Sequence, residues 1–103
     1  MKMAISSERK DIDSEVSLRG GRAPFYLIFE ENKLVKVLKN PFKMGGGGAG
    51  FGVAEMLADE KVDLVITGKI GNNMKGALES KNIKYKEMQN ITIKETLEKV
   101  ENA

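Results

Sequence analysis

Cations and glycines are the residues of this chain best placed to do chemistry, because its 103 residues include no histidine and no cysteine. These absences remove the thiolate nucleophile, the imidazole base, the disulfide bond and the zinc site of ordinary composition. A metal would need carboxylate, carbonyl or methionine ligands, or would arrive inside a preassembled anionic cluster. Catalysis is therefore the function that the composition favours least.

The densest group of such residues is GGGGAGFG, with six glycines at positions 45–52 immediately before a helical pattern. Glycines ahead of a helix N-terminus expose backbone N–H groups that can donate to an anion, and the helix dipole adds to the attraction. The run also suits a mobile loop that needs positive φ angles, so both interpretations remain open. Strands are expected on both sides of it, which excludes a linker between domains.

The glycine run also matches the dinucleotide fingerprint G-x-G-x-x-G at Gly45, Gly47 and Gly50. A run of glycines meets that pattern trivially, and the segment NPFKM separates it from the preceding strand. No acidic residue follows in a suitable place about twenty positions later, and no Walker-type lysine follows the glycines. The context therefore disfavours a dinucleotide or nucleotide triphosphate site.

Two other segments carry cations beside glycines. In SLRGGRA, Arg19 and Arg22 flank a glycine pair, and all three arginines of the chain lie between residues 9 and 22. Arginine makes planar, bidentate contacts to oxyanions that lysine cannot make. In TGKIGNN, Lys69 could reach an anion, although the two glycines there could serve only to turn the chain from a strand into a helix.

Direct metal ligands are harder to find. Asp11 and Asp13 lie two residues apart in a polar segment and could hold a hard cation, but such pairs more often form solvated turns. Met44, Met74 and Met88 are possible soft ligands for copper, and packing in the core is the alternative.

The overall composition indicates one globular domain over residues 1–103. Its net charge is only +2, from 17 basic and 15 acidic residues spread along the chain, which disfavours a nucleic-acid-binding face. No apolar run approaches the length of a membrane span, and MKMAISSERKD becomes charged too early for a signal peptide. We expect a cytoplasmic protein without membrane or nucleic-acid partners.

Hydrophobic patterns predict a strand, a hairpin, and then alternating helices and strands. A turn at Asn32-Lys33 would join the two hairpin strands, and Thr92 with Glu95 forms a capping box that begins the last helix. The apolar run VDLVITG is typical of a strand buried on both faces, and the lysine-rich IKYKEM of an edge strand. The expected strands span residues 1–7, 24–31, 34–40, 62–68 and 83–88, and the expected helices lie at 53–60, 71–82 and from 92 onward. The order βββαβαβα predicts an α/β fold with a five-stranded mixed sheet flanked by helices.

This order brings several loops to one edge of the sheet. If the first, third and fourth strands run in the same sense, the segment Glu8–Ala23, the glycine run and TGKIGNN all follow strand ends on that edge. Ligands of open α/β sheets bind in the crevice at the carboxyl ends of strands. We therefore expect a ligand cleft there, with two of the three arginines beside it.

With these motifs in place, the chain resembles the dinitrogenase iron-molybdenum cofactor biosynthesis family. The resemblance lies in MKMAISSERKDIDSEVS, GRAPFYLI, NPF, the stretch GGAGFGVAEMLADEKVDLVITGKIG and the capped C-terminal helix, in the right order over nearly the whole chain. It implies a ribonuclease H-like topology and a small domain that binds or carries metal-sulfur cofactors.

One departure from the family pattern bears on the cargo. The family's first loop usually reads S-x-x-F-G-R-A, often with a histidine before the phenylalanine, whereas this chain has Arg19 and Gly20 at those two places. The resemblance therefore implies noncovalent capture, by charge and glycine N–H groups, of an iron/molybdenum-sulfur cluster, a copper-molybdenum cluster or a molybdate-like oxyanion. The implied binding residues are Arg19, Gly21, Arg22, Gly46, Gly47, Gly48, Gly50, Lys69 and Gly71.

The residues and the resemblance leave three functions open. The leading one is a non-enzymatic binding or carrier protein for such an anion, with a protein partner in cofactor delivery. The alternatives are a small phosphate- or nucleotide-binding regulatory module that uses the same cleft, and a protein-interaction domain whose cleft is empty.

Overall fold

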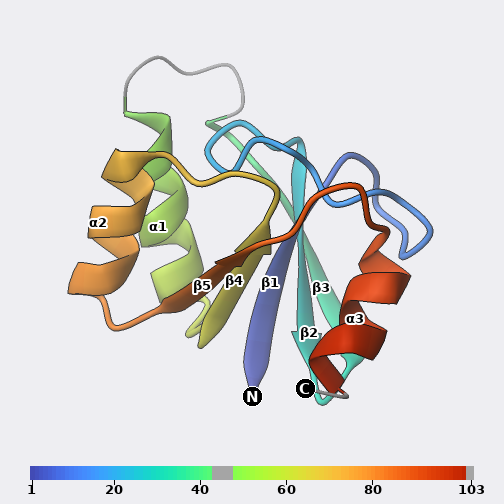
Figure 1. Cartoon of the computed structure of the whole chain (residues 1–103). Coiled ribbons are helices and arrows are strands. Elements are labelled where there is room, and N and C mark those ends of the chain that lie inside the picture. Colours follow the sequence, from blue (N-terminus) through green and yellow to red (C-terminus); the bar gives the residue numbers. More distant parts are fainter. Residues whose placement is uncertain (43–47, 102–103) are drawn as a thin grey trace.

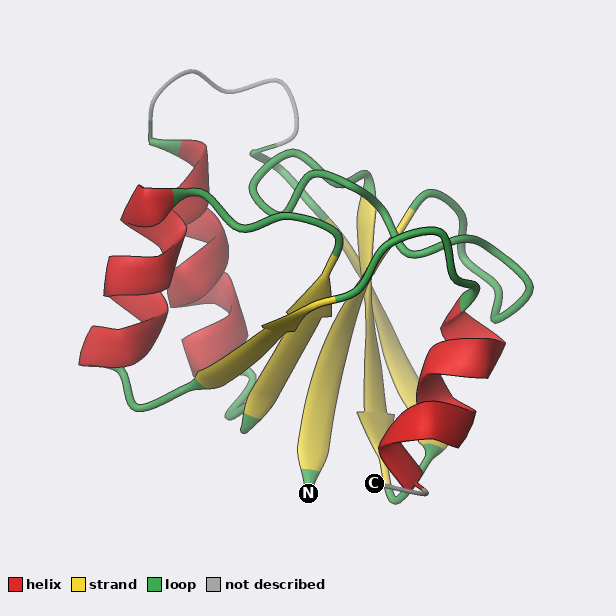
Figure 2. Cartoon of the chain, viewed as in Figure 1, coloured by secondary structure: helices red, strands yellow, loops and turns green. Residues whose placement is uncertain are grey.

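The computed structural model describes residues 1–42 and 48–101, which form five strands and three helices (Figures 1 and 2). In chain order these are β1 (Lys2–Ser7), β2 (Phe25–Glu30), β3 (Lys33–Lys39), α1 (Ala49–Asp59), β4 (Leu64–Thr67), α2 (Asn72–Ser80), β5 (Lys84–Glu87) and α3 (Ile93–Glu101). The predicted order βββαβαβα is confirmed. No helix among the described residues is long and apolar enough to cross a membrane.

The strands form one mixed sheet in the order β3-β2-β1-β4-β5. β2 is antiparallel to both β1 and β3, whereas β4 is parallel to both β1 and β5. The expected five-stranded mixed sheet is confirmed, and this topology is consistent with a ribonuclease H-like fold. As a result, β1, β3, β4 and β5 all end at the same edge of the sheet.

Helices cover both faces of the sheet (Figure 1). α1 and α2 pack on one face, where buried Val53, Leu57 and Leu78 belong to one hydrophobic cluster with Tyr26 and other side chains of the sheet. α3 packs on the opposite face through a second cluster that includes Ile93. Each fully buried aliphatic side chain contributes roughly 1.5–3 kcal/mol, so these two layers hold the sheet rigid beneath its loops.

The two strands whose environments were predicted from composition lie where expected. All four residues of β4, Leu64–Thr67, are buried, as expected for a central strand covered on both faces. β5 is an edge strand with three of its four residues exposed, which suits its lysines.

The predicted hairpin turn is wrong by one residue. Glu30 pairs with Lys33, so the turn residues are Glu31 and Asn32, with φ angles of 51° and 64°. Two-residue loops with positive φ at both positions match the right-handed twist of paired strands. That geometry outweighs the cost of placing a glutamate in the left-handed region, and Lys33 becomes the first residue of β3.

The predicted capping box at the start of α3 is confirmed. The backbone N–H of Thr92 donates to the carboxylate of Glu95 at 2.9 Å, and the backbone N–H of Glu95 donates to the Thr92 hydroxyl at 3.1 Å. The Thr92 hydroxyl also donates to the Glu95 carboxylate, at 3.0 Å. The two hydrogen bonds that this carboxylate accepts, from the backbone N–H of Thr92 first and from its hydroxyl second, lower the pKa of Glu95. Both N–H groups are satisfied, which fixes where the helix begins.

Removal of the Thr92 hydroxyl tests this boundary. We expect Thr92→Ala to lower the free energy of unfolding by about 1 kcal/mol, as measured by urea denaturation at pH 7. NMR titration should find the pKa of Glu95 closer to its ordinary value of 4.5. A carboxyl group whose pKa is lowered by folding stabilises the folded state above pH 4.5, and this stabilisation is lost as the pH falls through the folded-state pKa. The difference in unfolding free energy between the unsubstituted protein and Thr92→Ala should therefore become smaller in acid.

Ser80→Ala is the matched control, because the exposed Ser80 hydroxyl donates to the carbonyl of Ala77 and caps no helix N-terminus. Its stability should change by less than about 0.5 kcal/mol. Equal losses in the two variants would contradict the role given to the capping box.

Candidate functional site

The loops after β1 and after β4, at the carboxyl edge of the sheet, are joined by backbone pairing. The loop after β1 folds back so that Val16 pairs with Ser7, and Arg19 then pairs in parallel with Lys69 in the loop after β4. The carbonyl of Ser17 accepts the N–H of Gly68 at 2.8 Å. Two of the three segments that were expected to meet, those after β1 and β4, therefore lie side by side, whereas most of the glycine run lies outside the described residues.

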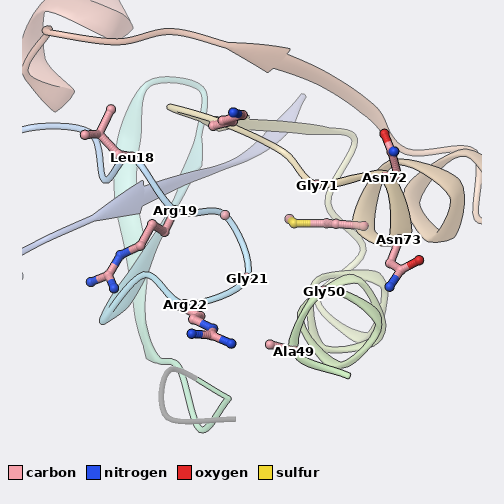
Figure 3. Close-up of a pocket in the computed structure, with 12 residues that line it drawn as sticks. Leu18, Arg19, Gly21, Arg22, Ala49, Gly50, Gly71, Asn72 and Asn73 are labelled. Carbon is pink, nitrogen blue, oxygen red and sulfur yellow. The ribbon is translucent and has the colours of Figure 1, made fainter. Parts of the chain in front are cut away.

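A pocket with a volume of about 430 Å³ opens between these loops and two helix N-termini (Figure 3). Its walls are residues 18–22, the first two residues of α1, Lys69, and residues 71–74 at the start of α2. Figure 3 shows Arg19 and Arg22 on one side of the pocket, with Asn72 and Asn73 on the other. One site thus combines residues 18–22, here called the arginine loop, with the residues that follow β4 and the first residues of α1 and α2.

The charge around the pocket is of one sign. Arg19, Arg22 and Lys69 are all exposed and line the pocket, and none of them forms an ion pair with any residue in 1–42 or 48–100. None of the lining residues that the structure describes is acidic. Three cations around one concave surface, with no counterion among the described side chains, produce a local positive potential that attracts anions.

The two helix N-termini add to this potential. α1 begins at Ala49 and α2 at Asn72, and both lack an acidic residue in the first turn and a side chain that caps the helix. The first N–H groups of a helix have no partner within the helix, and the dipole makes that end partly positive. Two such ends meet the pocket, so backbone donors supplement the cationic side chains.

Glycines allow the loops and helices to approach this closely. A Cβ on Gly68 would lie 2.6 Å from the Cα of Leu18, and one on Gly50 would lie 3.1 Å from the Cβ of Met74. No glycine in the described part of the chain has a positive φ. These glycines are therefore required for close contact, and the idea that the glycines serve a left-handed backbone finds no support where the structure describes them.

Several buried polar side chains hold the arginine loop from behind, and they were not predicted from the sequence. Asn40 is buried and donates its amide to the carbonyls of Gly21 and Ala23, at 3.0 and 2.8 Å. Its own side-chain oxygen accepts the N–H of Phe42 at 2.9 Å. All of these Asn40 bonds are to backbone groups, so one side chain ties the loop to the end of β3.

A second support lies at the base of the same loop. The hydroxyl of Ser6 lies 2.6 Å from that of Thr67, and the carbonyl of Ser17 accepts from this hydroxyl pair. The buried Tyr26 donates its hydroxyl to the carbonyl of Gly20, and burial raises the pKa of this phenol. The Tyr26 phenol therefore stays protonated and keeps its donor. Polar residues at inward positions of strands were the signal that could have revealed this support.

The structure brings most of the predicted binding residues together. Arg19, Gly21, Arg22, Gly50, Lys69 and Gly71 all line the pocket. Gly48 is the N-cap of α1 but does not line it. Gly46 and Gly47 lie outside the described residues. Whether any of these residues binds a ligand stays a prediction.

The possible metal ligands are mostly elsewhere. The side chain of Asp11 accepts the N–H of Asp13 at 3.0 Å and lies 3.7 Å from the guanidinium of Arg9, as in a surface turn. Met88 packs against the cluster beneath α3, whereas Met74 lines the pocket. Met44 lies outside the described residues. Within residues 1–42 and 48–101, no group of three or more carboxylates could hold a metal ion.

The fold and the site define a small α/β domain with a positively charged pocket at one edge of its sheet. The family model described as "Dinitrogenase iron-molybdenum cofactor" matches residues 1–103, so the chain belongs to this family. The family resemblance found in the sequence is thus confirmed. No curated protein sequence matches the chain.

Solved structures of other proteins share the fold. The apo form of the orange protein from Desulfovibrio gigas matches with a TM-score of 0.91 and 22% identity, over 98% of this chain and 87% of its own. A candidate NifB protein from Thermotoga matches with a TM-score of 0.85 and 27% identity, over 99% and 88%. A candidate dinitrogenase from Methanocaldococcus jannaschii matches with a TM-score of 0.62 and 19% identity, over 94% and 84%.

The contact at Gly68 gives a direct test of the loop packing. We expect Gly68→Ala to lower the free energy of unfolding by about 1–3 kcal/mol, because a methyl group would overlap the backbone of Leu18 and Ser17. The control is Gly76→Ala within α2, where a Cβ meets open space. That change should stabilise the protein by about 0.4–1 kcal/mol. Urea denaturation measures both, and equal effects would contradict the close contact.

The role of Asn40 can be tested with a side chain of the same size. Asn40→Asp removes both amide donors and sets a carboxylate against two carbonyl oxygens, so the free energy of unfolding should fall by about 1–3 kcal/mol at pH 7. The loss should be smaller at pH 4, since a protonated carboxyl group regains one donor. Asn82→Asp, at an exposed position with a φ of 60°, is the control and should change stability by less than about 0.5 kcal/mol. If both variants lost the same free energy of unfolding, Asn40 would not be a specific support of the arginine loop.

Proposed function

We propose that the pocket binds a compact, multiply charged anion without covalent bonds, and that the protein carries or shields this anion without transforming it. The class of anion is a metal-sulfur cluster or a molybdate-like oxyanion. The observation that carries the proposal is the arrangement of Arg19, Arg22 and Lys69 with two uncapped helix N-termini around one pocket. Its described lining residues include no acid that would repel an anion.

The lining favours a soft, sulfide-rich anion over phosphate. Phosphate is small and strongly hydrated, so a site for it needs many converging donors to replace its water. In this pocket the exposed Leu18 side chain adds apolar surface beside the cations. A large sulfide-bearing anion loses less hydration on contact with such groups while it keeps the attraction of the positive charges.

The family supports the same class of cargo. Its description names the iron-molybdenum cofactor, and one relative in fold, the orange protein, is described in an apo form. The proposed cargo is accordingly an iron/molybdenum-sulfur or copper-molybdenum cluster. A protein that delivers or receives this cluster is the partner that such a carrier requires.

The proposal that the protein is not an enzyme rests on its side chains. The chain has no histidine or cysteine, and Lys69 is the basic group of the pocket that could take part in proton transfer. Arginine stays protonated at any working pH, so Arg19 and Arg22 can bind and orient an anion but cannot act as bases. Such a set of groups suits retention of an anion better than its conversion.

Titration with tetrathiomolybdate tests the proposal. We expect amide NMR shifts to concentrate at residues 18–22, 48–52 and 68–74, and the affinity to fall as ionic strength rises. Replacing both arginines with glutamine, as Arg19→Gln with Arg22→Gln, should weaken binding about tenfold or more, because two charge-assisted hydrogen-bond donors are lost. Arg9→Gln is the matched control, since Arg9 faces Asp11 and does not line the pocket.

Three results would count against this function. Shifts scattered away from the pocket would overturn the site, and equal affinities in the double variant and the control would overturn the role of the two arginines. If inorganic phosphate or a nucleotide bound more tightly than tetrathiomolybdate, the pocket would be a site for phosphate compounds and not for metal-sulfur clusters.

A further inference from the structure

The outer edge of β3 differs from the other edge of the sheet. β3 is seven residues long and ends the sheet on its side, with no strand among the described residues beyond it. β5, at the opposite edge, has four residues. A long edge strand offers a row of backbone N–H and C=O groups to another chain, and proteins commonly shorten or cover such edges.

Exposed aliphatic side chains gather on this strand. Leu34, Val35 and Val37 are 42%, 54% and 37% exposed, and they are three of the seven large hydrophobic residues that are exposed in the described part of the chain. None of the four residues of β5 is among those seven. Single exposed apolar residues are ordinary, but three on one edge strand form a patch that needs an account.

The register shows what a further strand would meet on each face. Leu34 and Val37 pair with Phe29 and Leu27, which belong to the buried cluster under α3. An added strand would place its side chains beside Leu34 and Val37 and so extend this apolar layer outward. On the other face it would meet Lys36, which pairs with Ile28 of the cluster beneath α1 and α2.

Charge determines which partner fits. Lys33, Lys36 and Lys39 recur at every third residue of β3. A second copy paired antiparallel about Lys36 would set these lysines against one another, which is unfavourable. A carboxylate already meets the strand from the protein itself, because Glu60 lies 2.8 Å from the ammonium of Lys36. Lys33 and Lys39 form no ion pair with a described residue.

We propose that β3 is a docking edge for an extended segment of a partner protein in which aliphatic residues alternate with acidic ones. The segment adds a sixth strand to the sheet beside β3. Its backbone bonds to the free edge and its aliphatic side chains cover Leu34 and Val37. Its carboxylates lie on the opposite face of the sheet, beside Lys33 and Lys36, and Lys39 at the end of the strand adds to the positive potential. This inference concerns a different surface from the anion pocket and does not depend on what the pocket binds.

The probe is a peptide with blocked ends and the sequence EVEVEVE, added to the whole chain and followed by amide NMR. We expect the shifts to centre on residues 33–39. The peptide KVKVKVK, in which every charge is reversed, should bind at least tenfold more weakly than EVEVEVE. The affinity of the peptide EVEPEVE should also be at least tenfold lower than that of EVEVEVE, because proline removes a backbone donor and interrupts the strand.

Charge reversal gives the sharpest comparison. Lys33→Glu with Lys39→Glu should lower the affinity for EVEVEVE at least tenfold and raise that for KVKVKVK. The matched control reverses two lysines of the opposite edge strand, as Lys84→Glu with Lys86→Glu, and should leave both affinities unchanged. All four lysines are exposed, so both double variants are expected to fold.

Several outcomes would overturn the inference. Shifts centred on β5 or on the pocket would move the binding elsewhere. Equal binding of EVEVEVE and EVEPEVE would show attraction of charge without strand pairing. Absence of peptide binding, together with a concentration-dependent dimer in sedimentation whose shifts lie at residues 33–39, would assign this edge to a second copy of the chain.

Discussion

The backbone contact between the loop after β1 and the end of β4 is the constraint on which the site depends. The N–H of Gly68 donates to the carbonyl of Ser17, and the N–H of Gly20 donates to the carbonyl of Lys69. These two bonds bring Arg19 beside Lys69 although fifty residues separate them in the chain. Without this pairing, a polar loop of this length would have no reason to hold its two arginines at one wall of a pocket.

This constraint also explains how backbone groups come to line the pocket together with the cationic side chains. Because Gly68 leaves no room for a side chain and Gly50 lies against Met74, the walls come close enough for two helix N-termini to face one space. N–H groups held by helices are already oriented and need no side-chain ordering when an anion arrives. Backbone N–H groups bind negative charge well, but they do not act as general acids or bases, so such walls supply few groups that could transfer a proton.

Features whose causes are local could be predicted from the sequence. The capping box of Thr92 and Glu95, the buried run of β4 and the lysine-rich edge of β5 all depend on neighbouring residues, and they lie where expected. The arginine loop and the end of β4 could be placed at one edge because the expected directions of the strands determine which loops share it. The pocket's cationic residues followed from that placement.

Features that depend on distant partners could not be predicted in this way. The hairpin turn was misplaced because the pairing of Glu30 with Lys33, and not the local preference of Asn32, decides where β3 begins. The contribution of Asn40 is hidden for the same reason, since its two acceptors lie 19 and 17 residues earlier in the chain.

Asn40 also lies between the anion pocket and the lysine-bearing edge of β3. It directly follows Lys39, the last residue of β3, and its amide holds the carbonyl of Gly21, the residue before Arg22. The bonds of Asn40 are complete within the protein, so the arginine loop is already fixed before anything binds at either surface. Coupling between two sites requires an element with two arrangements that both ligands bias. A rigid support such as Asn40 is not an element with two arrangements. Peptide binding at the edge of β3 should therefore leave the affinity of the pocket for its anion unchanged, apart from the screened electrostatic effect of the added charge.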